Sequence, residues 1–140
     1  MSITKYVLPV VVGAMSGMIL ITLGEMVLHN MYPLPVGTDL YDADSLNKAM
    51  KVMPVNAFYF LLCNYVICSF IAGVVATLVS KRTDRMPAMV VGIVLTLGGV
   101  YNDVYLYHPG WFIAVNLLSY LPCTLLGYYL IRKKGTTIAM

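Results

Sequence analysis

The chain has 140 residues, of which 60% are apolar and only 11% are charged, and its mean hydropathy is +0.82. A water-soluble domain carries about 25% charged residues, so this chain has too little charge to cover a soluble globule. The net charge of +3 comes mostly from short basic clusters and is not a nucleic-acid-binding signature. We therefore expect one domain whose solvent is the lipid bilayer.

The first apolar segment covers residues 6–28, long enough to cross about 30 Å of hydrocarbon as a helix. It is longer than the apolar part of a signal peptide and lacks a small-x-small cleavage site, so we expect it to be retained. Gly13 and Gly17 form a GxxxG pair, and Gly24 lies on nearly the same face. Small residues let helix backbones approach closely. This stripe predicts a tight contact with a helix of this chain or of a second copy.

The longest connection covers residues 29–54 and begins with a stiff Tyr-Pro-Leu-Pro sequence. Further along, Asp42 or Asp44 is expected to cap a short helix that continues to Val52. Its apolar residues recur at helical spacing on one face: Leu46, Met50 and Met53. Such an amphipathic helix is expected on the outer surface, with its apolar side in the lipid headgroups.

Three further apolar segments cover residues 55–80, 87–104 and 111–131. A proline stands at or just before the start of each, where its missing N–H is not needed. Lipid leaves no backbone group unsatisfied, and four segments cannot close a β-barrel. We therefore predict an all-α, polytopic membrane protein, in which residues 1–140 form a single four-transmembrane-helix bundle.

Several residues inside these segments are expected to pack the helices together. Gly73 offers a flat surface for a neighbouring helix, and Asn64 and Asn116 are expected to form interhelical hydrogen bonds. Pro122 removes a backbone hydrogen bond to the carbonyl of Leu118 and should kink the fourth helix. The cysteines are interpreted as buried small apolar residues without a disulfide: Cys63, Cys68 and Cys123.

The distribution of basic residues predicts the orientation. One set of flanks holds most of them: Lys5, Lys81, Arg82, Arg85, Arg132, Lys133 and Lys134. The opposite flanks hold acidic residues and two lysines: Asp39, Asp42, Asp44, Asp103, Lys48 and Lys51. Basic flanks face the cytoplasm, so we expect both termini inside. Most tyrosines and the tryptophan gather near the two predicted boundaries, as in interfacial belts.

Five polar or titratable residues are expected to converge on the outer third of the bundle: Glu25, His29, Asn102, Asp103 and His108. A charge facing lipid costs about 2–3 kcal/mol, so Glu25 should face the bundle or reach outward to the interface. His29 follows one turn later on the same helical face.

Three interpretations of this cluster remain open. In the first, Glu25 and His29 are hydrogen-bonded partners that lock the first helix to the third and to the Pro-rich connection. Alternatively, the cluster binds a ligand or ion or relays protons, because burial raises a carboxylate pKa and imidazole titrates near neutrality. The third is a metal site of Glu25, His29, Asp103 and His108, although no recognised zinc-binding spacing is present. We predict no bound metal, cofactor or catalytic residue, because no nucleophile–base pair or phosphate-binding loop is recognisable.

A resemblance spans nearly the whole chain. It is carried by these residues: Gly13, Gly17, Glu25, His29, Tyr32-Pro33-Leu34-Pro35, Pro54, Gly73, Asn102, His108-Pro109-Gly110-Trp111-Phe112, Pro122 and Gly127. In these positions the chain resembles a group of short, four-span bacterial membrane proteins with no assigned function. The resemblance implies location in the bacterial inner membrane and supplies no activity.

The leading functional hypothesis is a non-enzymatic membrane protein that acts by helix association, as an accessory, scaffold or oligomeric component. Its partner would be a second copy or another membrane protein, and no nucleic acid. The alternative is a small-molecule, ion or proton-coupled transporter or channel that uses the outer polar cluster. The third is a lipid- or quinone-directed enzyme with His29 or His108 as acid or base.

Overall fold

The computed structural model describes residues 3–80 and 84–138, with side chains described up to residue 135. Lys81 and Arg82, used above to predict orientation, lie outside the described residues. The described chain is all-helical, with five helices: α1 (Thr4–Met31), α2 (Ala43–Lys51), α3 (Val55–Ser80), α4 (Met86–Tyr105) and α5 (Gly110–Ile138).

Four helices are long and apolar enough to cross a membrane: α1, α3, α4 and α5, the last over Gly110–Gly135. This confirms the all-helical class and the four predicted membrane helices. The second membrane helix, α3, has the expected bounds, 55–80, whereas α5 continues past the expected end at residue 131. Lysine and arginine are good helix formers, so the basic residues that follow the apolar segment extend this helix.

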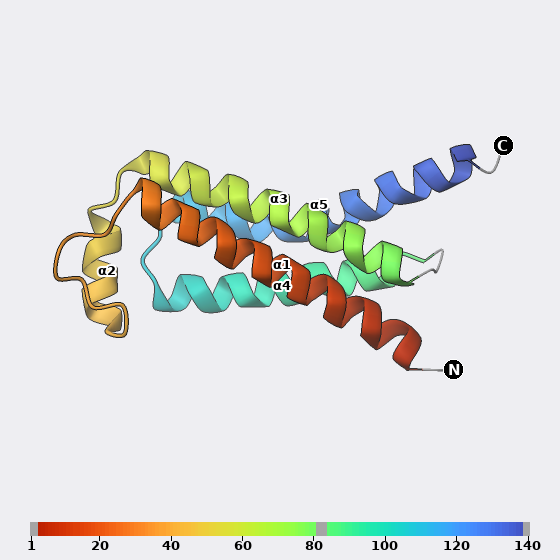
Figure 1. The fold of residues 1–140 in the computed structure, drawn as a ribbon, viewed down its shortest axis with the longest axis horizontal. Coiled ribbons are helices and arrows are strands. Elements are labelled where there is room, and N and C mark those ends of the chain that lie inside the picture. The colour runs from red at the N-terminus through yellow and green to blue at the C-terminus, as the bar shows by residue number, and fades with distance from the viewer. Residues whose placement is uncertain (1–2, 81–83, 139–140) are drawn as a thin grey trace.

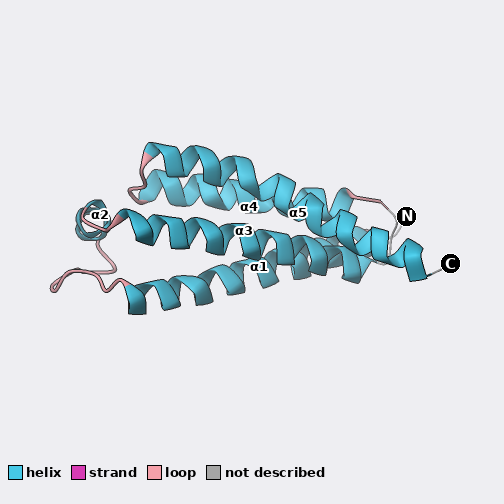
Figure 2. Cartoon of the chain, turned by 90° about the horizontal axis from the view of Figure 1, so that it is seen from above, coloured by secondary structure: helices cyan, strands magenta, loops and turns pink. Residues whose placement is uncertain are grey.

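The four long helices run side by side, with both ends of the chain at one end of the bundle and α2 crossing the other (Figure 1). We call the latter the α2 end. Seen from above, α3 lies between α1 on one side and the α4–α5 pair on the other (Figure 2). Helix α3 packs extensively against α1 and α5, whereas α1 and α4 contact each other much less. That weak contact leaves room for the crevice described below.

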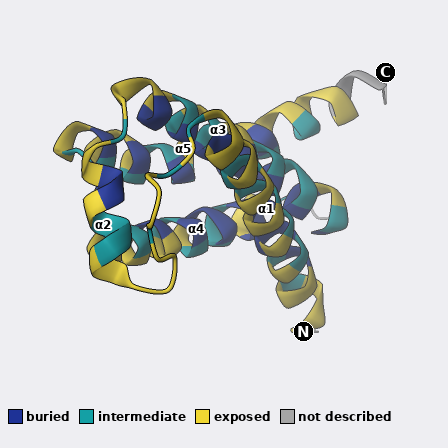
Figure 3. Ribbon diagram, turned by 60° about the vertical axis from the view of Figure 1, so that its left-hand side comes forward, coloured by how far each residue is buried: buried dark blue, intermediate teal, exposed yellow. Residues whose placement is uncertain are grey.

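Buried residues face the inside of the bundle, and much of the outward surface is exposed and apolar (Figure 3). Only 22% of the most apolar stretch of α1 is buried, against 39% for α3. A large exposed apolar surface is unfavourable in water but not in lipid. The distribution of burial therefore agrees with a membrane protein.

The glycine stripe of α1 packs within this chain. A Cβ atom added at Gly13 would lie 2.7 Å from Cβ of Ala76, and one at Gly17 would lie 2.9 Å from Cβ of Ala72. Both alanines belong to α3, so two rows of small side chains bring the helix backbones close together. The predicted tight contact of the first helix is thus made with α3.

Gly24 continues the same contact towards the α2 end. A Cβ atom there would collide with the side chain of Asn64, which donates from Nδ2 to the carbonyl of Ile21 at 3.2 Å. Asn64 therefore forms the interhelical hydrogen bond expected of it. Asn116 differs: it is buried, but its Oδ1 has no hydrogen-bond partner within the described part of the chain.

Helices α3 and α5 cross closely at two glycines. A Cβ atom at Gly73 would collide with the backbone of Thr124, and one at Gly127 would lie 2.6 Å from the carbonyl oxygen of Phe70. Pro122 is exposed, and α5 continues as one helix on both sides of it. Cys63 is exposed rather than buried, which corrects that expectation. Exposure of the Cys63 side chain on the apolar outer surface is tolerated because a thiol behaves as a small apolar group.

The predicted short helix is present as α2, and the carboxylate of Asp42 caps it by accepting a hydrogen bond from the backbone N–H of Ser45 at 3.1 Å. Its apolar side does not lie in the headgroups as expected. Met50 is only 7% exposed and joins the core cluster, and Met53 packs against that cluster. The bundle itself offers an apolar surface at this end, so α2 docks on protein.

Candidate functional site

Three helices contribute to a polar chain inside the bundle. The hydroxyl of Tyr65 on α3 donates to Oε1 of Glu25 on α1 at 2.7 Å. Nδ2 of Asn102 on α4 approaches the same hydroxyl oxygen at 3.4 Å, a long hydrogen bond. Tyr65 is only 3% exposed, so its hydroxyl needs a partner within the protein. We call these residues the Glu25–Tyr65–Asn102 chain.

This chain lines a crevice of about 320 Å³ between α1 and α4. Apolar side chains form much of the remaining lining, among them Met18, Ile21 and Leu95. A Cβ atom added at Gly98 would contact nothing within 4 Å, so the missing side chain helps to leave the crevice open. Met18 and Gly98 are exposed and belong to membrane-spanning helices. The opening of the α1/α4 crevice therefore faces lipid.

A second cavity, of about 100 Å³, lies between the Glu25–Tyr65–Asn102 chain and α2. The same three polar residues line both cavities, so they form the wall between them. His29 and His108 also line this second cavity, together with apolar residues of α2 and its flank. We call it the cavity beneath α2.

His108 lies in the short connection between α4 and α5, packed among aromatic rings. Its ring stacks on that of Phe112 at a centroid distance of 4.8 Å and meets the ring of Phe58 edge-on. Nδ1 lies 3.0 Å from Oδ1 of Asp103, with side-chain exposures of 1% and 6%, but the pair is not aligned as a hydrogen bond. Burial lowers the pKa of His108, opposed in part by a backbone hydrogen bond with Leu106. The imidazole is therefore held in its neutral form near pH 7.

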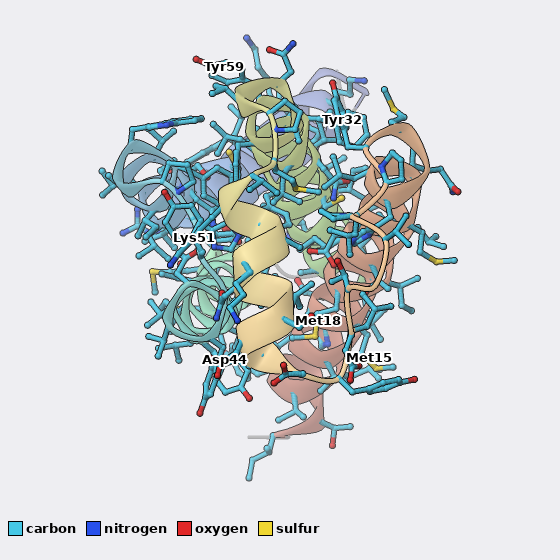
Figure 4. The ribbon with its side chains drawn as sticks, turned by 90° about the vertical axis from the view of Figure 1, so that its left-hand side faces the viewer. Met15, Met18, Tyr32, Asp44, Lys51 and Tyr59 are labelled. Atoms are coloured by element: carbon cyan, nitrogen blue, oxygen red, sulfur yellow. The ribbon has the colours of Figure 1, made fainter. Side chains whose placement is uncertain are left out.

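An open pocket of about 400 Å³ lies outside this pair, between α2 and the α4–α5 connection. Seen from the α2 end, Asp44 and Lys51 lie on the side of α2 that faces α4, whereas Met18 lies on the α1 side (Figure 4). Asn47 fastens α2 to the connection: its Nδ2 donates to the carbonyl of Tyr105 at 3.1 Å, and its Oδ1 accepts from the N–H of Tyr107 at 2.6 Å.

Four of the five predicted site residues line the cavity beneath α2, and the fifth, Asp103, is paired with His108. The expected bond between the side chains of Glu25 and His29 is not the one observed. Nδ1 of the exposed His29 donates to the backbone carbonyl of Glu25 at 2.8 Å, while the carboxylate takes its hydrogen bond from Tyr65. The carboxylate thus ties α1 to α3 rather than to α4, the third membrane helix, whose Asn102 amide is directed to the hydroxyl of Tyr65 instead.

The metal interpretation finds no geometric support in the described residues, among which no group of three or more His, Cys, Asp or Glu side chains is placed to hold an ion. Glu25 and His108 share a cavity, but His29 bonds to its own helix and Asp103 is turned towards His108.

Three residues of the site were not among those predicted from the sequence: Tyr65, Tyr120 and Asn47. Tyr65 and Tyr120 lie well inside their membrane helices, away from the boundaries where tyrosine usually lies. A tyrosine at that depth needs a partner for its hydroxyl, and this was the signal available. Asn47 gave no signal, because its role depends on a backbone segment almost 60 residues later.

No protein-family model, curated protein or solved structure matches this chain.

Proposed function

We propose that the protein is a non-enzymatic membrane protein that binds a small amphiphilic molecule, which enters the α1/α4 crevice sideways from the lipid. The observation that carries this proposal is an apolar crevice, open to lipid, with the Glu25–Tyr65–Asn102 chain in its wall. Binding sites for small molecules are concave and largely apolar, with a few placed polar groups. Its volume of about 320 Å³ falls at the lower end of the usual 300–1,000 Å³.

The Glu25–Tyr65–Asn102 chain is suited to ligand binding because some of its hydrogen-bond acceptors have no donor within the described residues. Glu25 Oε1 accepts from Tyr65, while no hydrogen bond to Oε2 is found among the described residues. An ionisable side chain inside a membrane is expensive and commonly functional. A ligand that donates a hydrogen bond would satisfy the remaining acceptor.

Helix association, the leading hypothesis from the sequence, loses its main motif as support. Gly13 and Gly17 pack against Ala76 and Ala72 of the same chain, so this stripe does not present a free surface to a second copy. An accessory, scaffold or oligomeric role would instead use the exposed apolar faces of the bundle, for example that of α1.

The orientation with both termini in the cytoplasm is also part of the proposal. Arg85, Lys133 and Lys134 flank the membrane helices at the end that carries the termini, whereas Asp39 and Asp42 lie at the α2 end. Basic flanks remain in the cytoplasm, which puts α2 outside. The resemblance described above favours the bacterial inner membrane.

Labelling with a short fatty alcohol that carries a photoreactive diazirine tests the proposed function. In phosphatidylcholine vesicles, the native chain should be labelled preferentially on the residues that line the crevice, as mapped by peptide mass spectrometry. Gly98→Leu fills the crevice and should abolish this preference. Gly135→Leu is the matched control, because Gly135 also faces open space but lines no part of the crevice. Labelling spread evenly over all lipid-facing surfaces, and unchanged by Gly98→Leu, would refute the proposal.

Transport is a second candidate, favoured by one observation. The Glu25–Tyr65–Asn102 chain separates the lipid-facing crevice from the cavity beneath α2, so a rearrangement of this wall would join them. Four packed helices do not enclose a water path, so permeation would have to use this crevice or an oligomer. A flux assay in vesicles, with Glu25→Gln beside the native chain, distinguishes transport from binding alone. Equal flux from the two proteins, or no flux from either, would exclude it.

A further inference from the structure

The α1/α4 crevice has an unbalanced charge. Glu25 contributes a carboxylate, and no lysine, arginine or histidine is present among the residues that line the crevice in the described chain. Asp103, next to Asn102 in sequence, adds a second acidic group nearby, and its partner His108 is held neutral by burial. A carboxylate in an apolar environment is stabilised by an opposite charge brought close to it.

Aromatic rings add a second, independent feature. Tyr65 and Tyr120 both line the crevice, and their ring centroids lie 6.3 Å apart with the planes tilted by 30°. The face of a tyrosine ring attracts an organic cation within about 6 Å, most strongly where water is excluded. A carboxylate and two aromatic rings around one apolar space are the groups that recognise a substituted ammonium ion.

The remaining polar atoms agree with this chemistry. Glu25 Oε2 and Asn102 Oδ1 accept no hydrogen bond among the described residues, so the wall offers acceptors to an incoming group. The hydroxyl of Tyr65 in this wall is already directed to Glu25. An anionic ligand would meet the carboxylate without a compensating positive group, and its binding would be opposed by charge repulsion.

We propose that the α1/α4 crevice selects a small amphiphilic organic cation, whose ammonium group lies beside Glu25 and against the rings of Tyr65 and Tyr120 and whose apolar part contacts Met18, Ile21 and Leu95. This inference rests on the proposed function, because it names the chemical class of the molecule that the crevice binds. It adds selection by charge to selection by shape.

Three naphthalene probes of similar size test this inference on the full chain in phosphatidylcholine nanodiscs. They are naphthylmethyl-trimethylammonium, its neutral isostere neopentylnaphthalene and the anion naphthylacetate. Binding is measured by equilibrium dialysis, with partition into empty nanodiscs subtracted. The native chain should bind the cation at least about tenfold more tightly than the neutral isostere, and the anion more weakly than either. This ratio needs no variant and so does not depend on how a variant folds.

Two variants then assign the effect. Glu25→Gln should remove the preference for the cation and leave affinity for the neutral probe within about twofold. Gly98→Leu should weaken binding of the cationic and the neutral probe by at least about tenfold each, and Gly135→Leu should change the affinity of neither.

Equal or tighter binding of the neutral isostere by the native chain would overturn the cation inference and leave the proposed function standing. Binding of no probe, or binding indifferent to Gly98→Leu, would overturn the proposed function and the inference with it. Retention of the full preference for the cation in Glu25→Gln would overturn the role of Glu25, and with it the inference.

Discussion

Replacing Tyr65 by phenylalanine removes one oxygen atom, which is the donor to Glu25 and the acceptor from Asn102. The ring and its packing remain, so the change isolates the polar chain. A hydrogen bond to a charged group contributes about 1.5–3 kcal/mol to stability, whereas hydrogen bonds between membrane helices average about 0.6 and reach about 1.7 kcal/mol. The bond of 2.7 Å to a carboxylate belongs at the upper end of the membrane range. We expect Tyr65→Phe to lower the free energy of unfolding by about 1–2 kcal/mol.

The assay is denaturation in mixed micelles, followed by circular dichroism, on a double-mutant cycle of Tyr65→Phe and Glu25→Gln. The coupling free energy between the two changes should be about 1 kcal/mol. Tyr101→Phe is the matched control, because Tyr101 is 66% exposed and loses the same atom without a buried partner. Two results would show that the hydrogen bond between Tyr65 and Glu25 does not stabilise the contact of α1 with α3. One is a coupling free energy below about 0.3 kcal/mol, and the other is an equal loss of unfolding free energy in Tyr101→Phe.

Further substitutions test the packing and the charge state. Gly73→Ala should lower the free energy of unfolding by about 1–3 kcal/mol, because the new methyl group meets the backbone of α5. Gly98→Ala should raise the free energy of unfolding by up to about 1 kcal/mol, because alanine favours the helix and its methyl group meets nothing within 4 Å. Both changes are measured by the same denaturation. Burial lowers the pKa of His108, so below pH about 6.5 the unfolded chain binds this proton more readily. The contribution of His108 to stability therefore falls as the pH falls, by at most about 1.4 kcal/mol per pH unit. His108→Gln should flatten this dependence between pH 7.5 and 5. Met50→Ala should cost about 2–5 kcal/mol if α2 is docked on the core, and a loss well under 1 kcal/mol would mean that its apolar side lies in lipid.

The helices themselves were predictable because apolar length alone requires them. A run of about 20 apolar residues has few alternatives in a bilayer, and the second membrane helix begins and ends where the sequence analysis expected. The short helix α2 was predictable from Asp42, whose side chain caps it. Its docking was not predictable, because an apolar face at i, i+4 and i+7 is equally suited to a lipid surface and to a protein surface.

The depth of the site within the bundle was predictable, but the contacts between its side chains were not. The depth of Glu25 and the spacing to His29 placed polar groups near one end. Which side chain meets the carboxylate depends on the rotation of α3 about its own axis, and that rotation follows from the packing of Gly13 and Gly17 against small residues. The crevice depends on the separation of α1 from α4, which no local sequence pattern encodes.

Asn47 has a consequence for how the protein is made. Its amide group holds α2 to the backbone at residues 105 and 107, at the end of α4 and in the connection that follows it. A ribosome completes α2 long before it reaches those residues, so α2 waits without its partner while α3 and α4 are synthesised. These two hydrogen bonds can form only after residue 107 has been synthesised and α4 has been inserted. Their formation would therefore mark the insertion of α4, and a chain arrested before residue 105 would hold α2 without them.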